Sequence, residues 1–91
     1  MRTPKQDLLE LINNTGWVYD LDDLNTVMKQ VDLDVMELVI VKFRDTHTYG
    51  YTIENKQKGK ILVMSVNVDK KNLFNEIVHS FEAIGIPMDT Y

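Results

Sequence analysis

The side chains in this chain that are typical of catalysis belong to two histidines, His47 and His79, and two serines, Ser65 and Ser80. His47 stands between two threonines, where an imidazole could act as a general base toward a hydroxyl group. Neither serine stands in the Gly-x-Ser-x-Gly turn that exposes a nucleophile. We interpret His47 as a solvated loop residue and His79 as part of a polar helix face. The sequence therefore predicts a protein that is not an enzyme.

Candidate metal ligands are equally sparse. The chain has no cysteine, which excludes disulfides, thiolate nucleophiles and cysteine-bound zinc. Two acidic groups superficially resemble calcium loops: Asp20, Asp22 and Asp23, and then Asp32 and Asp34. An EF-hand loop needs glycine at its sixth position and glutamate at its twelfth, and neither group has them. The sequence predicts neither a metal nor a cofactor.

The net charge is −4, and it is unevenly distributed along the chain. Residues 1–40 contain eight acidic and three basic side chains, whereas residues 41–91 contain six acidic and seven basic ones. The acidic excess argues against nonspecific binding to nucleic acid, which needs a basic surface. An acidic surface would instead attract a basic protein, for example one that itself binds nucleic acid.

The sequence gives no indication of a membrane location. Residues 1–7 lack the apolar segment of a signal peptide, and no uncharged apolar run approaches the roughly 18 residues that span a bilayer. A chain of 91 residues with 44% hydrophobic and 26% charged side chains is typical of one folded domain. We expect a single cytoplasmic domain over residues 1–91.

Two helices are predicted before the first strand. Thr3, Pro4 and Gln6 form a capping-box pattern that predicts a helix over residues 4–14. The second helix is predicted over residues 20–31, with Asp20 as its N-cap. Its apolar residues recur at helical spacing and would form one stripe: Leu21, Leu24, Met28 and Val31.

Three strands follow, predicted from β-branched and alternating apolar residues over residues 35–44, 48–55 and 60–68. A five-residue turn after the first strand would place Val41 and Phe43 opposite Tyr51 and Tyr49. A turn of another length would reverse the first strand. A four-residue loop in the second hairpin would pair the two tyrosines and Ile53 with three residues of the third strand: Leu62, Met64 and Val66.

The C-terminal part is predicted to be a helix over residues 70–84, capped by Asp69 and ended by Gly85. Residues 85–91 are expected to form a tail in which Ile86 can fold back onto the last helical turn and residues 88–91 are loose. The predicted fold class is α+β, with two N-terminal helices, a three-stranded antiparallel β-meander and a C-terminal helix (ααβββα).

One face of this predicted sheet needs a cover that the sequence does not identify. It carries Met36, Leu38, Ile40, Ile61 and Val63. Leaving several aliphatic side chains exposed costs free energy and favours aggregation. The cover is either one of the helices or another chain.

We therefore predict a small acidic protein-binding module whose partner is another protein. Short, acidic, cysteine-free chains without catalytic residues resemble in type the phage and mobile-element proteins that inhibit or regulate host machinery. In this interpretation an acidic surface occupies a basic groove of the partner. The predicted partner-binding residues are Asp20, Asp22, Asp23, Asp32, Asp34, Glu37, Leu38 and Ile40.

Two alternatives remain open at this point. The first is a homodimer or larger homo-oligomer, a structural or accessory protein that buries the face with Leu38, Ile40, Ile61 and Val63 against itself. The second is an RNA-binding module in which Tyr49 and Tyr51 stack on bases and the lysines of the Lys56–Lys60 loop contact phosphate. Exposed tyrosine rings would favour the second alternative.

Overall fold

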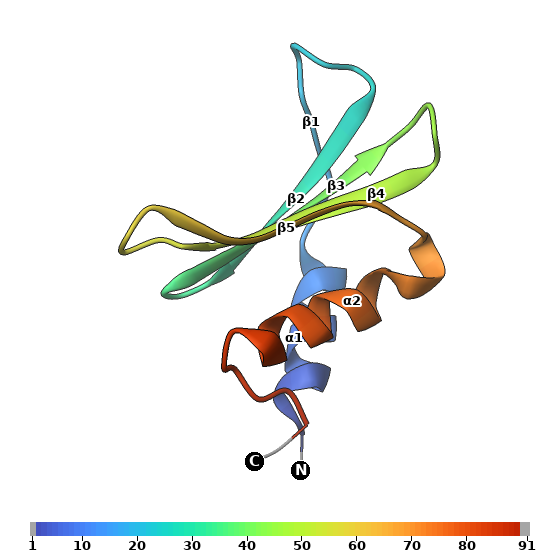
Figure 1. Ribbon diagram of the computed structural model, residues 1–91. Helices are drawn as coiled ribbons and strands as arrows, with labels where there is room; N and C mark the ends of the chain where they lie inside the picture. Colours follow the sequence, from blue (N-terminus) through green and yellow to red (C-terminus); the bar gives the residue numbers. More distant parts are fainter. Residues whose placement is uncertain (1, 90–91) are drawn as a thin grey trace.

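The computed structural model describes residues 2–89 and contains a helix, five strands and a second helix (Figure 1). Helix α1 spans Pro4–Asn14 and helix α2 spans Lys70–Ala83. The strands are β1 (Val18–Tyr19), β2 (Thr26–Leu33), β3 (Met36–Phe43), β4 (Thr48–Asn55) and β5 (Lys60–Val68). They form one antiparallel sheet in the order β1-β2-β3-β4-β5, so each strand pairs with its neighbours in the chain. The fold is α+β, with the element order αβββββα.

Helix α1 has the bounds and the cap that the sequence predicts. The Thr3 hydroxyl accepts the N–H of Gln6 at 3.2 Å, and the Gln6 side-chain oxygen accepts the N–H of Thr3 at 2.9 Å. Pro4 stands in the first turn, where its missing N–H costs nothing. The capping box is confirmed, and it determines the residue at which α1 begins.

The predicted second helix is wrong, and with it the predicted ααβββα order. Residues 20–31 form the β1–β2 loop and most of strand β2. The expected stripe does not form, since Leu21 and Leu24 are 90% and 70% exposed while Val31 is fully buried. Asp20 and Asp23 each accept the N–H of the residue two positions ahead, which makes turns rather than a helix cap.

Strand β2 forms because its pairing partner follows directly in the chain. Its residues pair one for one with β3 in an uninterrupted antiparallel register. Val27 and Val31 then point to one face of the sheet, which a period of two requires. Pairing with β3 provides both burial and backbone hydrogen bonds. Together these outweigh the weak helical preference of the segment.

Both helices pack on the same face of the sheet, here called the inner face (Figure 1). Helix α1 contacts β2, and α2 contacts β4 and β5. The core between the helices and the sheet is apolar and consists of Leu8, Val31, Leu38, Ile40, Tyr49, Tyr51, Ile53, Val68, Ile77, Val78, Phe81 and Met88. The opposite side of the sheet, here called the outer face, carries neither helix.

The β3–β4 turn decides which side chains of β3 enter this core. Four residues, 44–47, separate the two strands, and the register places Ile40 opposite Tyr51 and Leu38 opposite Ile53. The predicted pairing of Val41 and Phe43 with the tyrosines is therefore wrong. A change of one residue in a hairpin reverses every side chain of the strand, and the alternate side chains of β3 consequently lie on the outer face.

The predicted register of the second hairpin is also wrong, although its loop has the predicted four residues, 56–59. Tyr51 pairs with Ser65 and Ile53 pairs with Val63, and two register shifts interrupt the β4–β5 ladder. Val63 consequently packs against the core, whereas Met64 lies on the outer face. These shifts are β-bulges, which a count of loop residues does not reveal.

The segment after α2 is packed and not loose. The Ile86 N–H reaches back to the Phe81 carbonyl at 2.9 Å, and Gly85 has the left-handed φ of +93° predicted for it. Met88 is only 6% exposed, and its carbonyl accepts the N–H of Lys5 at 2.9 Å. Ile86 thus folds back onto the last turn as predicted, whereas the predicted loose tail is wrong for Met88; Thr90 and Tyr91 lie outside the described residues.

Candidate functional site

The candidate catalytic residues are dispersed in the structure. The Ser80 hydroxyl lies 2.6 Å from the Tyr51 hydroxyl, which also donates to the Glu76 carbonyl at 3.2 Å, so Ser80 joins α2 to β4. His79 is exposed on α2, and His47 is exposed in the β3–β4 turn with a φ of 58°. Across residues 2–89, no three or more histidine, aspartate or glutamate side chains are grouped so that they could hold a metal ion.

The six predicted partner-binding acids do not form one surface. Asp20, Asp22 and Asp23 lie in the loop before β2, whereas Asp32, Asp34 and Glu37 lie at the far end of that strand. Eight residues of extended chain separate the two groups by roughly 25 Å. The two groups therefore cannot share one small binding site.

Three carboxylates form a row across the outer face, here called the acidic row: Asp32, Glu37 and Glu54. Glu37 pairs directly with Asp32 on β2 and with Glu54 on β4. Like charges directly opposite each other destabilise a sheet. Lys56 offsets the repulsion between Asp32 and Glu37, since its ammonium group lies 2.5 Å from the Asp32 carboxylate. This hydrogen bond, with a second from the N–H of Asp34, lowers the pKa of Asp32.

The middle of the outer face is apolar, and its main side chains are here called the outer patch: Met28, Val39, Val41, Phe43, Met64 and Val66. Strand pairing brings them together, because Met28 is opposite Val41, and Thr52 stands between Val39 and Met64. Met64 is 66% and Val66 57% exposed. Solvent-exposed apolar side chains that adjoin one another on a sheet indicate a binding surface.

Gly50 shows how tightly the outer patch is packed. A Cβ atom there would lie 3.4 Å from the Phe43 ring, 3.4 Å from Val66 and 2.9 Å from the carbonyl oxygen of Ser65. The missing side chain thus leaves room for Phe43 and Val66 to cover the backbone. The last contact is with backbone, so it cannot be relieved by rotating a side chain.

We predict that Gly50→Ala destabilises the protein by about 1–3 kcal/mol, because the Ser65 carbonyl must move. This sign is informative, since alanine normally stabilises an extended segment relative to glycine. Urea unfolding of the variant would measure the effect. Gly16→Ala is the control, because nothing lies within 4 Å of the Cβ that it adds. Equal stability of Gly50→Ala and the natural protein would contradict this packing.

The remaining predicted site residues lie in the core. Leu38 is fully buried and Ile40 is 1% exposed, so the helices cover both and neither side chain can contact a partner. Tyr49 and Tyr51 are 6% and 3% exposed, which removes the stacking platform that the RNA-binding alternative requires. The apolar side chains that lack a cover are therefore those of the outer patch, and not Leu38 and Ile40.

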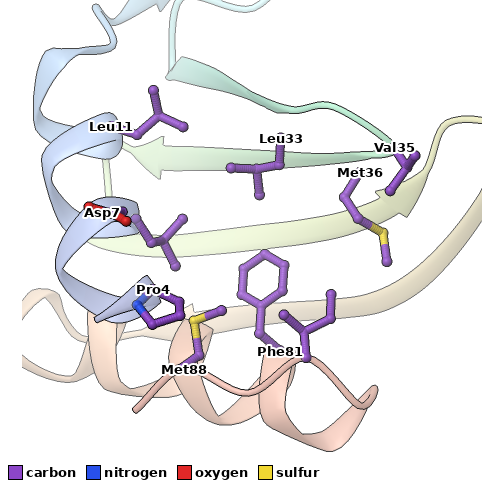
Figure 2. Close-up of a pocket in the computed structure, with 10 residues that line it drawn as sticks. Pro4, Asp7, Leu11, Leu33, Val35, Met36, Phe81 and Met88 are labelled. Carbon is purple, nitrogen blue, oxygen red and sulfur yellow. The ribbon is translucent and has the colours of Figure 1, made fainter. Parts of the chain in front are cut away.

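Two of the cavities on the inner face are lined by residues of both helices. The first, of about 330 Å³, is bounded by α1, the β2–β3 hairpin and the end of α2. Figure 2 shows Leu33 and Met36 from the hairpin, Phe81 from α2 and Met88 from the following segment around it. Asp7 is its only charged lining residue. This cavity is an extension of the apolar core.

The second cavity, of about 470 Å³, lies between the C-terminal half of α1 and the N-terminal half of α2. Apolar side chains from both helices and from the sheet line most of it. Its charged lining residues are all basic: Lys29, Lys42 and Lys70. It is called the lysine cavity below. The sequence did not reveal it, because its lysines are distributed over β2, β3 and α2.

The chain matches no family model, no curated protein and no solved structure. Within residues 2–89, no helix has both the length and the apolar character needed to cross a bilayer. The function must therefore be inferred from the surfaces and cavities described above.

Proposed function

We propose that this protein is a non-enzymatic binding module whose outer face takes a basic, amphipathic segment of another protein. One observation carries the proposal: the uncovered outer patch ends at the acidic row, so apolar and negatively charged groups adjoin on one surface. A segment with apolar residues on one side and basic residues toward one end would complement both features.

The outer patch supplies the apolar part of this complementarity. Met64 and Val66 are more than half exposed, and Phe43, Val41 and Val39 are half-buried beside them. Burial of apolar surface contributes roughly 25 cal/mol per Å², so covering adjacent side chains of this size stabilises a complex. Charged residues are also depleted at the centres of protein interfaces, as they are in the outer patch.

The acidic row determines the sign of the partner's charge and the end of the bound segment at which that charge lies. The cross-strand pair of Glu37 and Glu54 costs stability in the free protein. Arginine or lysine side chains of a partner would remove that cost on binding. A second copy of this chain would instead bring a second acidic row to the interface, which favours a basic partner over self-association. An inhibitor that occupies a basic protein surface is one form of this function, now limited to the acids beside the outer patch.

The test uses two synthetic amphipathic helical peptides of equal length, one built from leucine and lysine and the other from leucine and glutamate. We expect the basic peptide to bind and the acidic peptide not to bind, by calorimetry at low salt. The double substitution Val41→Gln/Met64→Gln should weaken binding by tenfold or more, at about 1.4 kcal/mol for each factor of ten. The exposed hairpin substitution Lys58→Gln is the matched control. Equal affinity for both peptides, or unchanged binding by the double variant, would refute the proposal.

The Glu37→Gln variant separates function from stability. It should weaken binding of the basic peptide and flatten its salt dependence, because one charge contact is lost. The folded state should keep or gain stability, because a like-charge pair is removed.

Sedimentation at two protein concentrations tests whether a second copy of this chain covers the outer face instead. A dimer that dissociates in the Val41→Gln/Met64→Gln variant would show that a second copy, and not a basic partner, covers the outer face.

A further inference from the structure

The lysine cavity has a charge opposite to that of the protein as a whole. The chain has a net charge of −4, yet the cavity has three lysines and no carboxylate in its lining. Asp69, which precedes Lys70, is exposed and does not line the cavity. The apolar lining comes mainly from Leu9 and Ile12 of α1, Trp17, and Leu73, Phe74 and Ile77 of α2.

The positions of the lysines are set by the fold. The Lys29 ammonium group donates to the Ile12 carbonyl at 2.9 Å and lies 4.9 Å from the centre of the Trp17 ring. It thus occupies the C-terminal end of α1, where a cation is favoured by the helix dipole. Lys42 lies on the inner face of the neighbouring strand, opposite Val27 and Tyr49. Lys70 is the first residue of α2.

Neither Lys42 nor Lys70 forms an ion pair with a carboxylate of the described residues. The ion pairs within residues 2–89 join Arg2 to Asp7 and Glu10, and Lys56 to Asp32, and none involves a cavity lysine. Lys42 is half-buried on the same face as Lys29, with the sheet on one side and apolar side chains on the other. Lys42 is thus partly desolvated whereas Lys70 is exposed, and an anion in the cavity would be attracted by both charges.

We propose that the lysine cavity binds a small amphipathic carboxylate. The apolar body of the ligand would lie against Leu73, Phe74 and Ile77, and its carboxylate would lie near Lys42 and Lys70. The N-terminal end of α2 adds a favourable dipole at the same place. A volume of about 470 Å³ is within the range of small-molecule sites. This site lies on the inner face, so it is independent of partner binding at the outer face.

Three probes with the same eight-carbon chain test the proposal: octanoate, 1-octanol and octylammonium. Trp17 is the only tryptophan and lines the cavity, so its fluorescence reports occupancy directly. We expect a saturable change with octanoate at an affinity about tenfold above that of octanol, which corresponds to about 1.4 kcal/mol. Octylammonium should bind more weakly than octanol. If octanol binds as tightly as octanoate, the cavity is an apolar void only and the proposal is wrong.

Variants identify the groups that select the carboxylate. Lys42→Gln/Lys70→Gln should reduce the affinity for octanoate about tenfold and leave that for octanol unchanged. Lys58→Gln/Lys60→Gln is the control, because it removes the same charge from the exposed β4–β5 hairpin. Equal weakening by both double variants would indicate a general charge effect and would overturn the assignment to the cavity. So would octanoate binding that Lys42→Gln/Lys70→Gln leaves unchanged.

Discussion

Replacing Leu38 with alanine is expected to destabilise the protein by about 2–5 kcal/mol, whereas replacing its neighbour Val39 should cost no more than about 1 kcal/mol. Leu38 is fully buried beneath the helices opposite Ile53, and its truncation leaves a cavity that the core cannot fill. Val39 is half-buried on the outer face, where water replaces the lost methyl groups. Urea unfolding with the slope m compared among the variants measures both effects.

This pair of adjacent substitutions tests the register of β3. A reversed strand would place Val39 in the core and Leu38 outside, and would invert the order of the two effects. Comparable losses for both variants would indicate that another chain covers the outer face under the conditions of measurement. Repeating the experiment at two protein concentrations would then reveal a dimer, since dimer stability depends on concentration.

The helix–strand error at residues 20–31 has a physical origin. Leu21, Leu24, Met28 and Val31 match a helical period, but residues 30–33 alternate polar and apolar side chains as a strand does. The choice depends on β3, since only a neighbouring strand with free backbone groups makes the extended form favourable. The sequence does indicate a β2–β3 hairpin at Asp34, which adopts a left-handed φ of 69° in the turn between the two strands. Aspartate tolerates this conformation and often marks tight turns.

The parts of the fold that the sequence predicted correctly depend on local chemistry. The capping box at Thr3, the left-handed Gly85 and the bounds of α1 follow from contacts within a few residues. The sheet faces depend on turn lengths and bulges, which the sequence left open. The binding surfaces likewise depend partly on local sequence and partly on strand register. The acids near residue 37 were identified, but their neighbours on the outer face required the register.

Each face of the sheet carries one of the two proposed binding sites. On the outer face, the acidic row and the outer patch share one surface because alternate residues of β2, β3 and β4 point the same way. On the inner face, Lys29 and Lys42 alternate with the buried residues of β2 and β3. Opposite charges are thereby sorted to opposite faces by strand periodicity alone. The separation allows an acidic protein to retain a basic cavity.

Phe81→Ala is the second substitution with a large expected effect, a loss of about 3–5 kcal/mol in the free energy of unfolding. Phe81 is 2% exposed and lies where α2, α1 and the segment with Met88 meet, beside the first cavity (Figure 2). Its removal would deepen the adjoining apolar cavity of about 330 Å³, which is partly open to solvent, so neighbouring side chains have little to collapse onto. Each kcal/mol lowers the Tm by roughly 4–8 °C in a domain of this size.

Phe81→Leu keeps the experiment informative, because a loss of 3–5 kcal/mol is a large share of the 5–15 kcal/mol typical of a domain. Leucine should restore part of the stability, since it occupies part of the same volume. Phe74→Ala provides the comparison on the same helix, because Phe74 is half-buried toward the lysine cavity and should cost less. A smaller loss for Phe81→Ala than for Phe74→Ala would place the centre of the core at the other end of α2. That result would contradict the packing of the C-terminal segment against α1, which the hydrogen bond from Lys5 to Met88 secures.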